Sequence, residues 1–183
     1  MYDAFKERAI GVGAEVHRFA TKGEATDFIL AFLQKEEIAD IPGSCAVWAE
    51  SPFLDGVGKT ALQQIAGIGF EVNRTLAAEA RVGISQMDWA LADTGSLVQD
   101  QSAVEKRLVS SLPAIHLALV PTANILEGKK ALFERLNPRT SSYIAFITGP
   151  SRTADIERVL TIGVHGPQRL IIVFVDELGG GIS

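Results

Sequence analysis

The chain has 183 residues, of which 47% are hydrophobic and 21% are charged, and its formal net charge is −5. This composition is typical of a soluble globular protein, and the length favours one domain with a sizeable core. The charge pattern contains no basic block that would favour nucleic acid or a membrane surface, no apolar run reaches the roughly 20 residues of a membrane helix, and the N-terminus lacks the apolar core of a secretory signal.

The first 40 residues predict helices. Residues 1 to about 20 begin as a helix, although Gly11 and Gly13 interrupt the pattern. Thr21 and Glu24 then have the spacing of a capping box, which opens a helix with one apolar face. That face consists of Ala25, Phe28, Ile29, Phe32 and Leu33.

Residues Cys45–Trp48 predict a strand, and Gly58-Lys-Thr60 after it resembles the end of a phosphate-binding loop. The first glycine of the motif G-x-x-x-x-G-K would fall at position 53, where this chain has Phe53. We therefore expect an ordinary helix start at this place and no nucleoside-triphosphate site.

The next segments predict an edge strand at 71–74, a short helix from Arg81 and a hairpin over 90–98. The hairpin turn brings together a carboxylate, two hydroxyls and a glycine, in Asp93, Thr94, Gly95 and Ser96. Asp93 can serve as a general base or bind a substrate hydroxyl. Turns favour the same residue types for structural reasons, so both interpretations stay open.

A second capping box, Ser102 to Glu105, predicts a helix that Pro113 closes. A strand follows over 115–120 and contains His116. A single histidine within a strand is more often a hydrogen-bonded structural residue than a catalyst, but it remains a candidate for either role. Residues 122–136 predict a further helix.

Residues 143–176 predict a strand, a helix and a second strand. Tyr143–Ile147 and Leu170–Val175 are apolar runs, and Ile156, Val159 and Leu160 have helical spacing between them. Such units are almost always right-handed crossovers in a parallel sheet. The turn after the first strand would lie at the N-terminus of the helix, where ligands of α/β folds collect.

This turn, Gly149 to Thr153, is the predicted anion site. Gly149 would let the backbone approach a ligand, Ser151 and Thr153 add hydroxyls, and Arg152 adds a planar cation suited to carboxylate or phosphate. The alternative is an ordinary turn that caps the helix and leaves Arg152 in solvent. His165 is expected in the opposite turn, far from Gly149, beside a helix C-terminus or in a subunit contact.

Several of these motifs resemble the LUD-domain family. The resemblance is strongest in Thr148-Gly-Pro-Ser-Arg-Thr-Ala-Asp-Ile-Glu157 and Gly163-Val-His-Gly-Pro167. Ala92-Asp-Thr-Gly-Ser-Leu-Val98 and Leu112-Pro-Ala-Ile-His116 are similar to that family as well, in the same order along the chain. The resemblance therefore covers the chain from about residue 82 to residue 176.

The resemblance implies a fold and a domain organisation. We expect a three-layer α/β fold with a mostly parallel sheet and helices on both faces, of the type shared by glucosamine-phosphate deaminase, ribose-phosphate isomerase and the CoA transferases. One LUD domain would span residues 1–183, with a helical N-terminal segment (1–40) packed on it and a flexible tail at 177–183.

The resemblance also implies a role in the oxidation of L-lactate to pyruvate alongside iron–sulfur partner proteins. The single cysteine, Cys45, cannot hold such a cluster, and it is typical of a cytoplasmic protein. The three histidines lack metal-binding spacing, and no Gly-x-Gly-x-x-Gly follows a strand. We therefore expect no metal and no cofactor in this chain, and clusters in its partners.

Three functions stay open. The first is a non-redox subunit of a cytoplasmic lactate-oxidation system, which binds a small carboxylate or phosphate through the Gly149 turn together with Gly95 and Ser96. The second is an independent enzyme for a phosphorylated or acyl-CoA ligand, with Asp93, Thr94 or His116 as catalytic candidates. The third is a scaffold for partner proteins. Homo-oligomerisation also stays open.

Overall fold

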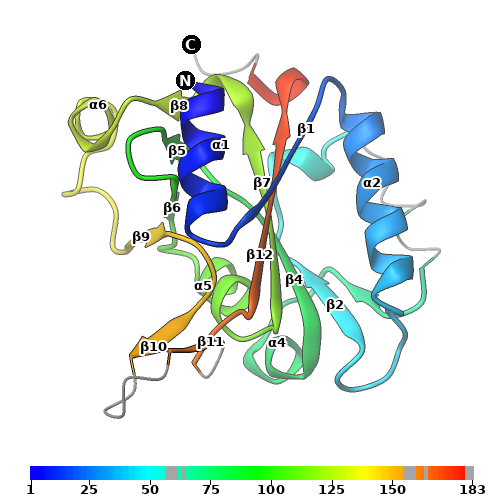
Figure 1. Ribbon diagram of the computed structural model, residues 1–183. Coiled ribbons are helices and arrows are strands. Elements are labelled where there is room, and N and C mark those ends of the chain that lie inside the picture. The colour runs from blue at the N-terminus through cyan, green and yellow to red at the C-terminus, as the bar shows by residue number, and fades with distance from the viewer. Residues whose placement is uncertain (57–61, 63–64, 155–159, 163–164, 180–183) are drawn as a thin grey trace.

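The computed structural model describes residues 1–56, 62, 65–154, 160–162 and 165–179 (Figure 1). Its centre is a six-stranded sheet in which all neighbouring strands are parallel, in the order β1-β12-β7-β4-β2-β3. The strands are β1 (Glu15–Phe19), β2 (Cys45–Trp48), β3 (Ile68–Gly69), β4 (Ala80–Gln86), β7 (Ile115–Pro121) and β12 (Arg169–Val175). The parallel sheet expected from the family resemblance is confirmed.

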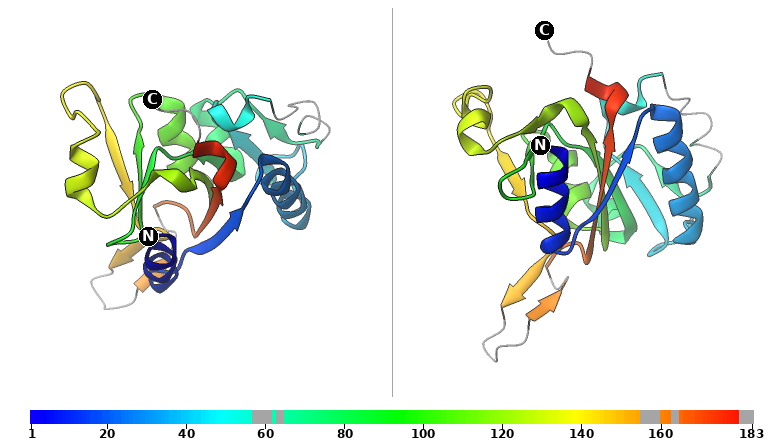
Figure 2. Two further views of the ribbon diagram at one scale, coloured as in Figure 1. Left: turned by 90° about the horizontal axis from the view of Figure 1, so that it is seen from above. Right: turned by 45° about the horizontal axis from the view of Figure 1, so that its top comes forward.

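Helices cover both faces of this sheet (Figure 2). Helix α2 (Lys22–Lys35) packs on one face, while α1 (Tyr2–Gly11), α4 (Arg74–Glu79) and α5 (Val104–Ser111) pack on the other. The three-layer architecture is therefore confirmed as well. None of the helices among the described residues is both long and apolar enough to span a membrane.

The predicted capping box at the start of α2 is present. The Thr21 hydroxyl accepts a hydrogen bond from the Glu24 backbone N–H at 3.2 Å, and the Glu24 carboxylate accepts one from the Thr21 N–H at 3.2 Å. Of the predicted apolar face, Ala25, Ile29, Phe32 and Leu33 are buried, and Phe28 is half-buried.

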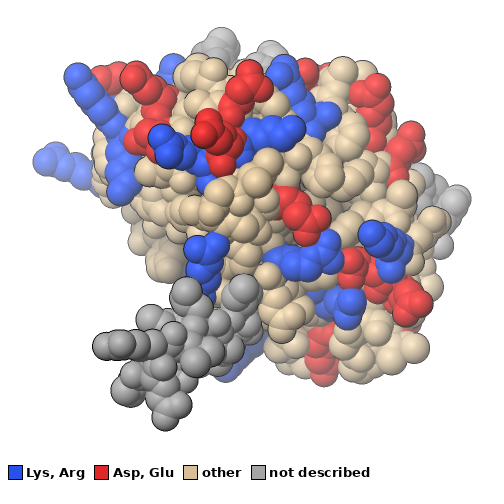
Figure 3. All heavy atoms as spheres, viewed as in Figure 1, with Lys and Arg blue, Asp and Glu red and all other residues tan. Residues whose placement is uncertain are grey.

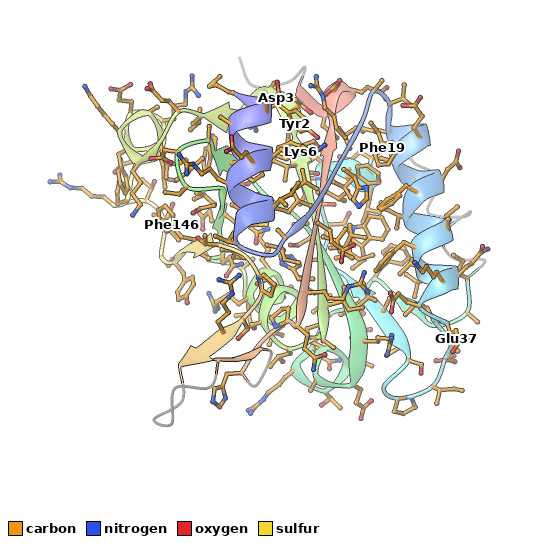
Figure 4. The ribbon with its side chains drawn as sticks, in the orientation of Figure 1. Tyr2, Asp3, Lys6, Phe19, Glu37 and Phe146 are labelled. Carbon is orange, nitrogen blue, oxygen red and sulfur yellow. The ribbon has the colours of Figure 1, made fainter. Side chains whose placement is uncertain are left out.

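Residues 1–40 contain a strand as well as helices. Strand β1 pairs in parallel with β12, from Glu15 opposite Ile171 to Phe19 opposite Val175. Tyr2 lies on α1 (Figure 4). Its ring lies edge-on to Phe174 with 5.4 Å between ring centres, and the Arg18 guanidinium lies 4.9 Å from the Tyr2 ring centre. The N-terminal segment is therefore part of the sheet and its core.

A second, smaller sheet lies on the α1 side of the large one. Its order is β8-β5-β6-β9, and α6 packs on its outer face. The elements are β5 (Trp89–Leu91), β6 (Ser96–Asp100), β8 (Ile125–Leu126), α6 (Lys129–Phe133) and β9 (Ile144–Ile147). The antiparallel pairing of β5 with β6 confirms the predicted hairpin.

The predicted strand–helix–strand unit at 143–176 is wrong. Strand β9 pairs antiparallel with β6 in the small sheet, so it is not a neighbour of β12. Strand β10 (Arg152–Ala154) pairs antiparallel with β11 (Leu160–Ile162), where the helix was expected to begin and end. The middle of that expected helix, 155–159, lies outside the described residues. A short apolar run does not identify its partner strand, which is why the pattern misled.

Three other segments form a different kind of secondary structure from the one predicted. The segment after Arg81 is strand β4, because its alternate residues Val82 and Ile84 are buried against α2. The edge strand is β3, and residue 74 already begins α4, with the Asn73 side chain accepting from the Leu76 N–H. Residues 122–136 form η2 (Thr122–Asn124), β8 and the short α6.

The second predicted capping box is absent. Ser102 is not a cap of α5, because its hydroxyl donates to the Asp100 carboxylate at 2.6 Å and α5 begins two residues later. The chain also contains η1 (Pro52–Leu54) and η3 (Asp176–Gly179). The helix start expected at 58–60 lies outside the described residues.

Charged side chains of both signs are interspersed on the face that carries α1 and α2 (Figure 3). Several form ion pairs between elements. Glu36, at the end of α2, binds Arg169 at 2.7 Å and Arg81 at 2.9 Å, and Arg18 binds Asp176 at 2.8 Å. The first two pairs hold the end of α2 on the amino edge of the large sheet.

Replacing Thr21 by Ala should lower the free energy of unfolding by about 1 kcal/mol, because the Glu24 N–H loses its acceptor at the start of α2. Urea unfolding followed by circular dichroism measures this change. Thr21→Ser is the matched control, since it keeps the hydroxyl and should stay close to the wild type. Equal losses in both variants would contradict the capping role.

Candidate functional site

A cavity of about 270 Å³ lies beside the amino ends of β7 and β12, and we call it the amino-end cavity. Its wall comes from the end of α5, from β7, from β9 and the turn after it, and from the segment before β12. The polar lining residues are Ser110, Ser111, His116, Thr148, Ser151 and His165. The cavity therefore joins four segments that are distant in sequence.

His116 is the only ionisable side chain of this lining that is completely buried. It lies opposite Leu170 on β12 and Gly83 on β4, and it projects from the same sheet face as Ala118 and Val120, toward α5 and β9. Its Nε2 atom lies 2.9 Å from the Ser85 hydroxyl oxygen. Its Nδ1 atom has no hydrogen-bond partner among the described residues.

Burial sets the protonation state of this histidine. Loss of solvent lowers the pKa of His116 to about 4, because the charged imidazolium is poorly stabilised away from water. The ring is therefore neutral at physiological pH. It can exchange hydrogen bonds with a ligand in the amino-end cavity, but it does not attract that ligand by charge.

The Gly149 turn lies between this cavity and α1. Gly149 has φ +70°, and an added Cβ atom would lie 2.4 Å from the Val12 carbonyl oxygen. The Arg152 guanidinium donates a hydrogen bond to the same oxygen. Because Val12 directly follows α1, this charge lies at the negative end of a helix. The turn thus contacts α1, and Arg152 is not among the residues that line the cavity.

The two halves of the Asp93–Ser96 turn lie at different sites: Gly95 and Ser96 lie beside α1 and the amino-end cavity, and Asp93 lines another pocket. Ser96 lies 2.7 Å from the Thr148 hydroxyl, oxygen to oxygen, at the edge of the amino-end cavity. Gly95 has φ +68°, and an added Cβ atom would lie 2.5 Å from the Ala9 backbone nitrogen. This half of the turn therefore connects α1 with the cavity wall.

Asp93 lines a different pocket, at the start of α6, and Thr94 follows it in the turn. The Asp93 N–H donates to the Glu127 carbonyl at 3.0 Å, and the Thr94 hydroxyl lies 3.2 Å from the Asp93 carboxylate. A Cβ atom added to Gly128 would lie 2.4 Å from that carboxylate. The structure therefore does not bring Asp93 together with His116.

His165 was expected far from Gly149, and the structure places both in the wall of one cavity. The expectation failed because it assumed a parallel crossover that separates the two turns. Instead the chain folds back, and the Ser151 N–H donates to the Pro167 carbonyl at 2.8 Å. Thr153 lies on β10 opposite Thr161.

Some features of the structure were not indicated by any pattern in the sequence. Ser85 belongs to a segment that was predicted as a helix, and Ser110 and Ser111 lie at the end of α5. A larger cleft of about 850 Å³ also opens at the opposite edge of the sheet. Assignment of β4 as a strand would have placed Ser85 in the sheet, but only the tertiary structure shows that β4 pairs with β7 beside His116. No group of three or more His, Cys, Asp or Glu side chains within the described ranges has the arrangement of a metal site.

The protein is therefore of the three-layer α/β class, with a parallel central sheet. A small cavity of ligand size lies at the amino edge of that sheet. The LUD domain family matches residues 2–175, and the chain belongs to this family.

Several similar proteins are called lactate utilization protein C. Those of an Exiguobacterium species and of Oceanobacillus iheyensis are 35% identical over 114 and 117 residues, which is 59% and 61% of this chain and 50% of each relative. That of Geobacillus thermodenitrificans is 29% identical over 173 residues, covering 84% of this chain and 72% of the relative. The chain spans about half the length of the first two.

A solved structure has the same fold. The crystal structure of a DUF162 family protein from Deinococcus radiodurans is similar with a TM-score of 0.62 over 95% of both chains, at 17% sequence identity. At this identity the similarity concerns the fold alone.

Gly149→Ala should destabilise the protein by about 2 kcal/mol or more, because the left-handed backbone and the Val12 carbonyl both oppose a side chain. Urea unfolding measures the change. Gly11→Ala is the control, since nothing lies within 4 Å of its added Cβ, and it should stay within about 1 kcal/mol of the wild type. If Gly149→Ala were as stable as the wild type, the close approach of Gly149 to the residue after α1 would be contradicted.

The stability should depend on pH through His116. Because burial lowers the pKa of His116 to about 4, the unfolded chain takes up its proton first as the pH falls. Stability is therefore lost below about pH 6.5, and the loss between about pH 7 and about pH 5 should be on the order of 2 kcal/mol larger in the wild type than in His116→Gln. Urea unfolding at several pH values tests this, and parallel curves for the two proteins would refute it.

Proposed function

We propose that this chain is a ligand-binding subunit of a cytoplasmic lactate utilisation system, and that the amino-end cavity holds a small carboxylate or phosphate. The observation that carries the proposal is the buried His116, which lines a polar cavity and whose Nδ1 atom has no hydrogen-bond partner within the described part of the chain. A buried polar atom without a partner is costly, and a bound ligand would supply the missing hydrogen bond.

The lining suits a ligand of the size of lactate. Four hydroxyl groups and two imidazoles surround a volume of about 270 Å³, which is near the lower end of small-molecule sites. Hydroxyl and imidazole N–H groups can donate to a carboxylate, and the same hydroxyls can accept from the hydroxyl of a hydroxy acid. The names of the relatives support lactate utilisation as the process in which this site works.

Binding accounts for the geometry better than catalysis does. The Ser85 hydroxyl and His116 Nε2 have the 2.9 Å separation of a nucleophile and its base. Both side chains are completely buried, however, and a histidine with a pKa of about 4 is a weak base at neutral pH. We therefore assign this pair to the binding and orientation of the ligand.

We also propose that electron transfer belongs to iron–sulfur partner proteins. The 183 residues contain one cysteine, Cys45, whereas such clusters need several cysteine ligands. Burial also raises the pKa of the Cys45 thiol, which disfavours the thiolate that binds metals. The chain would then contribute ligand binding, and its partners would contribute oxidation.

Calorimetric titration with L-lactate, pyruvate and inorganic phosphate tests the ligand proposal. At least one of these probes should bind, and His116→Gln should weaken that binding about tenfold, because the missing hydrogen bond to a charged acceptor is worth about 1.5–3 kcal/mol. Arg152→Ala is the matched control, since its guanidinium lies at α1 and not in the cavity lining.

Two results would refute the ligand proposal. One is that none of the three probes binds at millimolar concentration. The other is that Arg152→Ala abolishes binding while His116→Gln does not, which would move the ligand to the surface turn. Co-purification of the chain from its own cells, with a lactate-dependent dye-reduction assay on the eluate, tests the partner proposal separately.

A further inference from the structure

The large cleft at the opposite edge of the sheet, which we call the carboxyl-end cleft, has a volume of about 850 Å³. Most of its wall is formed by segments at or after the ends of four parallel strands, at the upper edge in Figure 1, and Arg135 is added from the segment after α6. These segments contain Pro52 after β2, Gln86 and Asp88 at the end of β4, Asn124 after β7 and Leu178 after β12. No side chain of the described residues fills this volume.

The connectivity of the sheet changes direction at this cleft. Strands β2 and β4 are neighbours, but the chain leaves β2 toward β3 on one side and leaves β4 toward β7 on the other. Chain segments therefore diverge above the carboxyl ends of this pair. In open α/β sheets such a switch point creates the crevice in which ligands bind.

The polar groups of the cleft are held in fixed positions. The Gln86 side-chain oxygen accepts from the Phe53 N–H at 2.8 Å, which bridges the two diverging segments. The Asp88 carboxylate accepts from the Asp100 N–H at 2.6 Å, and the Asp88 carbonyl accepts from the Asn124 amide at 2.8 Å. Amide and carboxyl groups that are anchored in this way can exchange hydrogen bonds with a ligand at little entropic cost.

Arg135 gives the cleft its cation. Its side chain is exposed, lines the cleft, and forms no ion pair with the part of the chain that the structure describes. Trp89, Pro52 and Leu178 supply an apolar wall. The cleft thus offers a charge for an anion, a flat apolar surface and a row of hydrogen-bonding groups, and the amino-end cavity lacks both the arginine and the size.

We propose that the carboxyl-end cleft binds an organic anion of nucleotide size, with its phosphate on Arg135 and its ring edge or hydroxyls on Gln86, Asp88 and Asn124. The volume of the cleft is within the range of sites for ligands of this size. The guanidinium fork matches phosphate oxygens, and the planar ring of the ligand packs on the apolar wall. This site is independent of the ligand proposed for the amino-end cavity.

Tryptophan fluorescence tests the proposal, because Trp89 lines the cleft whereas Trp48 is completely buried. The probes are AMP, adenosine, which lacks the anion, and ribose 5-phosphate, which lacks the base. AMP should change the emission and bind more tightly than either fragment. The emission change should disappear in Trp89→Phe.

Arg135→Ala should weaken AMP binding about tenfold and leave the binding of adenosine unchanged. Arg139→Ala is the control, since it removes another exposed arginine that does not line the cleft. His116→Gln should not affect AMP. The proposal is overturned if AMP fails to bind, if both arginine variants behave alike, or if His116→Gln abolishes AMP binding, which would assign the nucleotide to the amino-end cavity.

Discussion

Burial of β12 on both faces is the constraint on which the rest of the structure depends. The strand lies between β1 and β7, and its residues Leu170 to Val175 are at most 1% exposed. Alternate side chains enter the core under α2 and the core under α1, and each contributes roughly 1.5–3 kcal/mol by leaving water. Because β12 and β7 run in register, their two ends fix the positions of the amino-end cavity and the carboxyl-end cleft.

The turns at Gly95 and Gly149, which belong to the motifs that resemble the LUD family, have a structural role because both pack against α1. Gly95 and Gly149 have left-handed backbones, and each approaches the backbone of α1 or the residue after it too closely for a side chain. Arg152 donates to the carbonyl at the end of the same helix. Glycine and arginine at such positions therefore do not by themselves indicate a ligand. His116 is the stronger signal, because its Nδ1 atom has no hydrogen-bond partner among the residues that the structure describes.

The two edges of the sheet differ in the chemistry they offer. At the amino edge a neutral imidazole and hydroxyl groups line a small volume, so the recognition proposed there would depend on hydrogen bonds. At the carboxyl edge Arg135 adds a full charge. The volume of the cleft there is about 850 Å³, about three times the 270 Å³ of the amino-end cavity. The two proposed sites therefore differ in the size of the ligand that would fit, and they lie at opposite ends of the central strands.

The sequence by itself determined those elements that can be recognised from a short stretch of consecutive residues. The apolar stripe and capping box of α2, the buried run of β12 and the β5–β6 hairpin were all predicted correctly, and the family motifs indicated the α/β class. Only the tertiary structure decided which strand pairs with β9, that residues 80–86 form β4, and that His116 faces Ser85 beside His165. The physical reason is that hydrogen bonds between strands and the closure of cavities join residues distant in sequence, whereas periodicity reports only which side of a single element is buried.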